Sequence, residues 1–100
     1  MAYERLVRKL TKENLWLYVI SVLRGGPMYG YAIKKAIVEK FGFKPPTITV
    51  YAVIYKMVME GLIEKFIDGG TTYYRLTGKG LTLFERARDF IRSLEKGVFE

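Results

Sequence analysis

The side chains that could do chemistry in this chain are hydroxyls and cations, because it contains no His and no Cys. The lack of both residue types excludes disulfides and Cys/His metal sites, and it excludes nucleophilic catalysis by Ser-His or Cys-His pairs. The ten Asp and Glu residues are scattered, mostly on faces rich in Lys and Arg, and form no convincing acid–base pair. We therefore expect no enzyme, no metal and no cofactor.

The charge of the chain favours a polyanionic partner. Seventeen Lys and Arg against ten Asp and Glu give a net charge of +7 and a pI of about 9.7. This balance is typical of nucleic-acid-binding domains, although a soluble protein that is simply basic would share it. The chain has 100 residues, half of them apolar, so we expect one small domain that an oligomer would stabilise.

Residues 47–59 combine hydroxyls, small apolar groups and one cation. If the apolar positions 50, 53, 54 and 57 point inward at helical spacing, these groups form the outward face. In a DNA major groove, the hydroxyls could bind phosphates or base edges, and the methyl groups of Thr49 and Ala52 could touch thymine methyls. Because base-specific donors are few, we expect much of the specificity to come from DNA shape. The alternative is that Tyr55 and Met59 are buried against a partner protein. The candidate DNA contacts of the segment are Thr47, Thr49, Tyr51, Ala52, Tyr55 and Lys56.

Two more segments carry candidate DNA contacts. Lys34 and Lys35 lie together on a predicted helix, where they either touch phosphates or form a solvated face. At the start of that helix, Tyr29 and Gly30 offer a hydroxyl and a backbone N–H, although close helix packing would equally explain Gly30. The second segment is a predicted hairpin that could reach the DNA backbone or minor groove. Its candidates are Lys65, Thr71, Thr72, Tyr73 and Arg75.

Two sets of cations have a competing explanation. Arg75 is the main candidate of the hairpin, and the alternative is a surface ion pair with Glu64 on the opposite strand. A basic segment precedes the domain and could extend the DNA footprint, but a solvated helix face is the preferred interpretation. Its cations are Arg5, Arg8, Lys9 and Lys12.

The spacing of apolar residues predicts four helices ahead of the hairpin, over residues 3–10, 12–24, 29–41 and 48–59. Thr11 and Thr47 are the candidate N-caps of the second and the fourth helix. The fourth segment is rich in β-branched and aromatic residues, which favours a strand by propensity. Its length and its apolar spacing favour a helix instead.

A hairpin and a last helix complete the chain. Strands are predicted over 63–67 and 72–76, with Tyr74 and Leu76 inward and their odd-numbered neighbours outward. Thr77 caps a helix that runs to about Lys96 and ends at Gly97. Its apolar stripe either pairs two subunits or packs back on its own domain, and residues of the N-terminal helix could join it. The candidate dimer contacts are Leu6, Leu10, Leu83, Phe84, Ala87, Phe90, Ile91 and Leu94.

This order of elements predicts a mostly helical α+β fold. It is that of a winged helix-turn-helix with an added N-terminal helix and a C-terminal dimerisation helix. We assign residues 1–12 to the basic N-terminal helix, 13–77 to a DNA-binding domain and 78–100 to the dimerisation helix. The apolar run 15–23 is too short for a bilayer, which needs about 20 residues, and no signal-peptide cleavage site follows it. We expect a cytoplasmic protein with no membrane partner.

Three motifs in this order resemble the PadR family of transcriptional regulators. They are Gly26-Pro27-Met28-Tyr29-Gly30-Tyr31, then Thr49-Val50-Tyr51 with Glu60-Gly61-Leu62-Ile63, and then Tyr73-Tyr74-Arg75-Leu76-Thr77-Gly78-Lys79-Gly80. The resemblance covers roughly residues 15–96. The chain departs from the family pattern at Ile48, where Gly is frequent, at Ala52, where Pro is frequent, and at Thr71 and Thr72, where Arg is frequent. The last departure argues against strong clamping of phosphates by the wing.

The resemblance implies a homodimeric repressor or activator that binds a pseudo-palindrome in double-stranded DNA. It also implies that small aromatic or cationic effectors act through the dimer. The single Trp of the chain, Trp16, could stack on such a ligand or pack in the core. Two other functions stay open. The apolar segment 48–59 would suit a winged-helix module for protein–protein interaction, and the eight Tyr residues with the positive charge would suit RNA binding.

Overall fold

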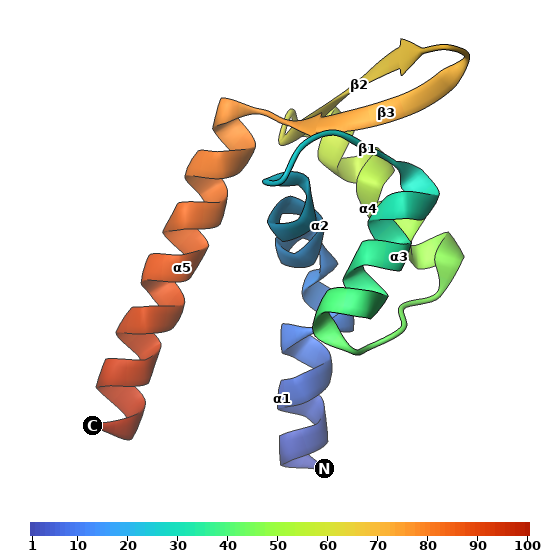
Figure 1. Ribbon diagram of the computed structural model, residues 1–100. Helices are drawn as coiled ribbons and strands as arrows, with labels where there is room; N and C mark the ends of the chain where they lie inside the picture. Colours follow the sequence, from blue (N-terminus) through green and yellow to red (C-terminus); the bar gives the residue numbers. More distant parts are fainter.

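The computed structural model describes residues 1–100 and confirms the predicted order of four helices, a hairpin and a last helix (Figure 1). It adds a 3₁₀ turn after the first helix and a two-residue strand before the third. The elements are α1 (Ala2–Leu10), η1 (Lys12–Asn14), α2 (Leu15–Leu23), β1 (Met28–Tyr29), α3 (Gly30–Phe41), α4 (Thr47–Met59), β2 (Ile63–Asp68), β3 (Thr71–Leu76) and α5 (Gly78–Phe99).

The core lies between α2, α3, α4 and the base of the hairpin. On α4, Val50, Ile54 and Met57 are at most 1% exposed, and Val53 is half-buried, as the helical spacing predicted. The β-branched residues of this segment still form a helix because one side of it is fully buried, and tertiary packing outweighs local propensity. The buried apolar residues are Leu15, Val19, Ile20, Val22, Leu23, Ile33, Ile37, Val50, Ile54, Met57, Leu62 and Ile63.

The sheet has three antiparallel strands in the order β1-β3-β2. Gly69 and Gly70 have φ values of 57° and 81°, the left-handed conformation that a two-residue hairpin turn of type I′ requires. The prediction that Tyr29 belongs to α3 was wrong, because Met28 and Tyr29 pair with Tyr74 and Tyr73 of β3. The helix therefore begins one residue later, at Gly30.

Three predicted helix boundaries also differ. Thr11 does not cap α2, because it lies between α1 and η1, its hydroxyl donates to the Val7 carbonyl (2.7 Å), and α2 starts only after η1. Pro46, and not Thr47, occupies the N-cap position of α4, so Thr47 is the first helical residue. Gly97 does not end α5, which continues to Phe99.

The capping role of Thr77 is confirmed. Its hydroxyl accepts a hydrogen bond from the Gly80 backbone N–H (3.1 Å) and donates to the Gly61 carbonyl (2.7 Å). One side chain thus starts α5 and ties it to the end of α4.

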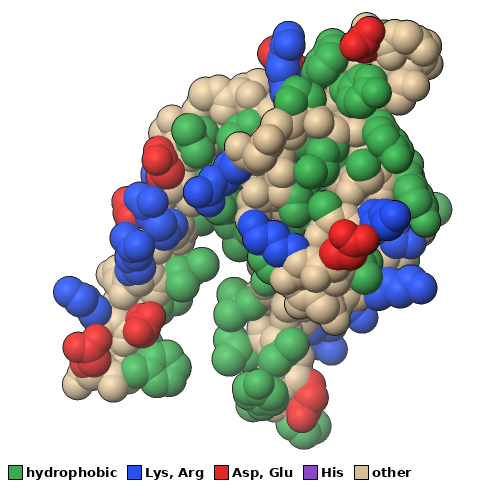
Figure 2. Space-filling model, in the orientation of Figure 1, with side chains coloured by type: hydrophobic (Ala, Val, Ile, Leu, Met, Phe, Trp, Pro, Cys, Tyr) green, Lys and Arg blue, Asp and Glu red, His purple; other side chains and the backbone are tan.

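Helices α1 and α5 project from the body in the same direction (Figure 1). Every residue of α1 is exposed, and so is α5 from Arg88 onward. Figure 2 shows apolar side chains on the sides of the two helices that face each other, while the cations of α5 lie on its other side. No helix of the chain combines the length and apolar character needed to cross a membrane.

Candidate nucleic-acid interface

The outer side of α4 is a line of four exposed residues at helical spacing: Ile48, Ala52, Tyr55 and Met59. Ile48 is 80% exposed, Tyr55 67% and Met59 70%. The line lies opposite the buried residues of the same helix, so the packing of α4 itself turns it to solvent. Of the predicted contacts, Ala52 and Tyr55 lie on this line.

The flanks of α4 hold three more predicted contacts. Lys56 is exposed and forms no ion pair within the chain, so its ammonium is free for a phosphate. Tyr51 is 42% exposed, and its ring lies against Gly30 of α3. Thr49 is half-buried beside them.

Lys34 and Lys35 differ in role. The Lys34 ammonium donates a hydrogen bond to the Thr47 hydroxyl, which joins α3 to the first turn of α4. Lys35 is exposed and forms no such bond. The structure therefore brings Lys34 and Thr47 together at the edge of the α4 surface, whereas the neighbouring Lys35 points to solvent.

The predicted wing contacts lie on two different faces of the hairpin. Lys65 is paired with Tyr74 across the strands, and Thr72 stands two residues before Tyr74, so all three share one face. Tyr74 packs against the core, and its strand neighbours toward the hairpin tip extend beyond the helices (Figure 1). Tyr73 and Arg75 occupy the opposite, outer face, as predicted for the odd-numbered residues.

The outer face carries a row of aromatic rings. Tyr29 of β1, Tyr73 of β3 and Phe66 of β2 are direct cross-strand neighbours, with ring centroids 6.2 and 5.6 Å apart. The Arg75 guanidinium lies 4.8 Å from the centre of the Phe66 ring, and its Nε lies 2.6 Å from a Glu64 carboxylate oxygen. The alternative explanation of Arg75, an ion pair across the hairpin, is therefore present in the free protein.

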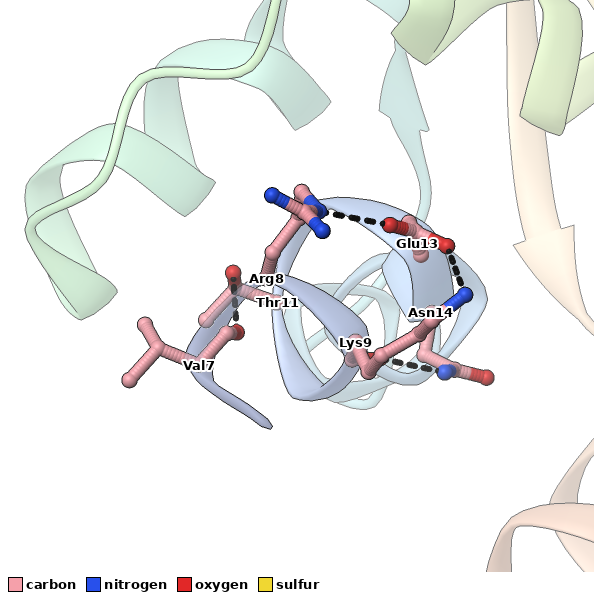
Figure 3. A network of polar contacts seen from close by, with 6 residues as sticks. All are labelled: Val7, Arg8, Lys9, Thr11, Glu13 and Asn14. Atoms are coloured by element: carbon pink, nitrogen blue, oxygen red, sulfur yellow. Dashed lines mark hydrogen bonds and ion pairs between the residues drawn. The ribbon is translucent and has the colours of Figure 1, made fainter. Parts of the chain in front are cut away.

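The N-terminal cations Arg8 and Lys9 are paired within the chain. Arg8 Nε and Lys9 Nζ contact the two carboxylate oxygens of Glu13 at 3.0 and 2.7 Å (Figure 3). The hydrogen bond from Lys9, and then that from Arg8, lower the pKa of Glu13 from its ordinary value of 4.5. The Asn14 amide donates to the Lys9 carbonyl in the same network.

Further along, the Tyr18 hydroxyl donates to the Leu10 carbonyl, and burial raises the pKa of Tyr18. Together with the Glu13 network, this bond fixes the direction of α1 relative to α2. Arg8 and Lys9 thus hold α1 in place, in agreement with the preferred interpretation of a helix face. The other two cations of the segment, Arg5 and Lys12, are exposed.

The predicted dimer stripe of α5 divides into two parts. Leu83 and Phe84 pack against the core of their own domain, and Ala87 is half-buried. Phe90 and Ile91 stay exposed. The second part continues beyond the predicted end of the helix and faces exposed apolar residues of α1. The large apolar residues exposed on α1 and on this part of α5 are Tyr3, Leu6, Val7, Leu10, Phe90, Ile91, Leu94, Val98 and Phe99.

Ile48 and Met59 lie on the outward line but are not among the predicted contacts. Ile48 departs from the family pattern, and its spacing of four from Ala52 and seven from Tyr55 is the signal that places it on this line. Trp16 is half-buried against the core and also borders a pocket of about 380 Å³. Lys56 of α4 and Glu60, the residue that follows α4, also line that pocket.

Solved structures with this arrangement of elements are transcription regulators and a DNA-binding protein. A transcriptional regulator from Clostridium thermocellum matches with a TM-score of 0.76 and 24% identity, over 83% of this chain and 84% of its own. A PadR family transcription regulator from Clostridium difficile matches with a TM-score of 0.70 and 24% identity, over 85% and 97% of the two chains. F93 from STIV, described as a winged-helix DNA-binding protein, matches with a TM-score of 0.71 and 18% identity, over 88% and 94%.

These likenesses establish the winged-helix fold, and the sequence itself establishes the family. No curated protein matches the chain significantly. The model of the transcriptional regulator PadR-like family matches residues 19–86, from the middle of α2 into the first turns of α5. The match spans the core, α4 and the whole hairpin, and the chain therefore belongs to the PadR-like family of transcriptional regulators.

Proposed function

We propose that this protein is a homodimeric transcriptional regulator that binds double-stranded DNA at a pseudo-palindromic operator. One observation carries the proposal: α4 is held by three buried residues and turns an unobstructed line of side chains, with the free cation Lys56 beside it, to solvent. In a winged helix, this is the helix that enters the major groove. Such a role places the protein with the DNA in the cytoplasm.

The hairpin supplies the second contact with DNA. Lys65, in the middle of β2, and Thr72, near the tip, are on the same face of the hairpin, where they can approach the backbone beside the groove that α4 occupies. Glu64 competes with a phosphate for Arg75, because the ion pair holds its guanidinium over Phe66 in the free protein. The remaining contacts that we propose are Tyr29, Lys34, Lys35, Thr47, Thr49, Tyr51, Ala52, Tyr55, Lys56 and Tyr73.

A second copy of the chain completes the molecule. The apolar faces of α1 and α5 project into solvent on facing sides, and an exposed surface of this kind is typical of an unoccupied protein–protein interface (Figure 2). In the dimer, two α4 helices about 34 Å apart would contact successive major grooves on one side of the DNA. The half-sites of the operator would then be related by the two-fold axis of the dimer.

Selection from random duplex DNA across a salt series tests the proposal. We expect the bound fraction to be enriched in a pseudo-palindrome, and we expect log K to fall with log salt by about 0.9 for each phosphate contact. A chain that binds no duplex at low ionic strength contradicts the proposal. So does salt-dependent binding that enriches no sequence.

The exposed line of α4 also supports a second candidate, a winged-helix module for protein–protein interaction. Three of its four residues, Ile48, Tyr55 and Met59, are large and mostly exposed, and aromatic and Met side chains are enriched in protein interfaces. This candidate predicts no salt-dependent binding to duplex DNA at any ionic strength. The same selection therefore separates the two functions.

A further inference from the structure

The line of α4 residues that faces solvent has almost no group that can hydrogen-bond to a base. Ile48, Ala52 and Met59 have purely apolar or thioether side chains, and Tyr55 offers one hydroxyl. A guanine is most often recognised by Arg or Lys, and an adenine by Asn or Gln, through two parallel hydrogen bonds. None of these four residue types stands on the outer line.

Of the neighbouring polar groups, Lys56 is the one that we propose to bind a phosphate, and two others are already engaged within the chain. The Thr47 hydroxyl already accepts a hydrogen bond from Lys34, and the Tyr51 ring is held against Gly30. The chain has no Gln, and its one Asn, Asn14, lies outside α4, where its amide donates to the Lys9 carbonyl at the end of α1 (Figure 3). Helix α4 therefore has no side-chain amide with which to recognise an adenine.

The major groove has one apolar feature, the C5-methyl group of thymine. Given that α4 occupies that groove, as the proposed function requires, we infer that Ile48 recognises a thymine methyl group, with Ala52 beside it. The N-terminal residues of a recognition helix contact the base edges, which favours Ile48 over Met59 at the other end. At 80% exposed, Ile48 has most of its side-chain surface available to be buried against DNA. The operator half-site is thus defined by thymines more than by guanines.

Replacement of thymine by uracil tests this inference, because uracil keeps every hydrogen-bonding group of thymine and lacks only the methyl. The duplex recovered by selection is synthesised with thymine, and then with uracil at one thymine of each half-site at a time. We expect one position at which the wild-type protein loses about fourfold in affinity per half-site, the factor that corresponds to about 0.8 kcal/mol for a buried methyl or methylene group. At that position, Ile48→Ser should bind the thymine and uracil duplexes equally.

Ile67→Ser is the matched control. Ile67 is 73% exposed on the hairpin, which in the proposed complex lies at the DNA backbone beside the groove, so the variant should keep the full difference between thymine and uracil. Equal binding of both duplexes by the wild type overturns the inference and leaves the proposed function standing. A difference that persists in Ile48→Ser also overturns it. A protein that binds no selected duplex contradicts the proposed function and the inference together.

Discussion

The ring of Tyr51 on α4 lies directly against Gly30, the first residue of α3. A Cβ atom at position 30 would come within 3.0 Å of both Cζ and the hydroxyl oxygen of Tyr51, closer than packed atoms allow. The absence of a side chain at Gly30 therefore sets how closely α3 approaches α4. The alternative that explained Gly30 by close packing of two helices is what the structure shows.

Gly30→Ala should destabilise the protein by about 1–3 kcal/mol, the usual cost of an overpacked site. The expected measurement is a lower midpoint in urea unfolding. Gly97→Ala is the control, because position 97 has open space around it inside a helix, where Ala is favoured over Gly by about 0.5–1 kcal/mol. If the Tyr51 ring causes the effect, Gly30→Ala should cost less in a Tyr51→Ala background. Equal stability of Gly30→Ala and the wild type would refute the packing argument.

Lys56→Ala should weaken binding to all duplex DNA and lower the slope of log K against log salt by about 0.9, the value for one phosphate contact. The reason is that Lys56 is the exposed cation of α4 and has no intramolecular partner. Lys40→Ala is the control, since Lys40 lies at the end of α3 over the Phe41 ring. An unchanged slope in Lys56→Ala would remove this residue from the interface.

Ile91→Glu should convert a dimer into a monomer. Ile91 is 43% exposed on the apolar side of α5, where a carboxylate buried between two subunits would be strongly disfavoured. Sedimentation equilibrium measures the result, and Arg86→Ala, which changes an exposed cation of the same helix, should leave the dimer intact. A wild-type protein that sediments as a monomer would already contradict the proposed assembly.

Acid should loosen the junction between α1 and α2. The pKa of Glu13 is lowered in the folded protein by the hydrogen bonds from Lys9 and Arg8. The ion pairs therefore contribute fully above pH 4.5, and their contribution is lost as the pH falls through the lower, folded-state value. Glu13→Gln should show the same loosening at neutral pH, measured as faster amide exchange in α1, whereas Glu39→Gln on α3 should not. Identical exchange in Glu13→Gln and the wild type would show that the network does not hold α1.

The helices could be predicted from sequence wherever one side of them is buried. On α4, the helical spacing of Val50, Ile54 and Met57 favoured a helix although the β-branched and aromatic residues of the segment favour a strand. The structure confirms the helix. Strand β1 could not be predicted, because Met28 and Tyr29 are extended only through their pairing with Tyr74 and Tyr73, more than forty residues away in sequence. The spacing of apolar residues within one segment carries no information about a strand that pairs with it from a distant part of the chain.

The sequence predicted which residues belong to the candidate surface better than it predicted on which face each of them lies. Alternation along β3 placed Tyr73 and Arg75 on the outer face, as observed. The position of Lys65 on the opposite face followed only from the register that pairs it with Tyr74. Likewise, Leu83 and Phe84 belong to the same stripe as Ile91, yet they pack on their own domain, because α5 leaves the body only after its first turns.

The ion pair between Arg75 and Glu64 predicts a gain in DNA affinity when the carboxylate is removed. In the free protein, the Glu64 carboxylate lies 2.6 Å from Arg75 Nε, so it competes with a phosphate for the guanidinium. An exposed pair of this kind contributes about 0–1 kcal/mol, and Glu64→Gln should therefore tighten binding by up to about fivefold.

The removal of any negative charge near DNA also strengthens binding in a general way, and a double-mutant cycle separates the two effects. In an Arg75→Ala background, Glu64→Gln should give a clearly smaller gain, because no guanidinium is released to reach a phosphate. Filter-binding or fluorescence titrations of the four proteins at one salt concentration measure the coupling. Equal gains with and without Arg75 would mean that Arg75 stays over Phe66 and makes no contact with a phosphate.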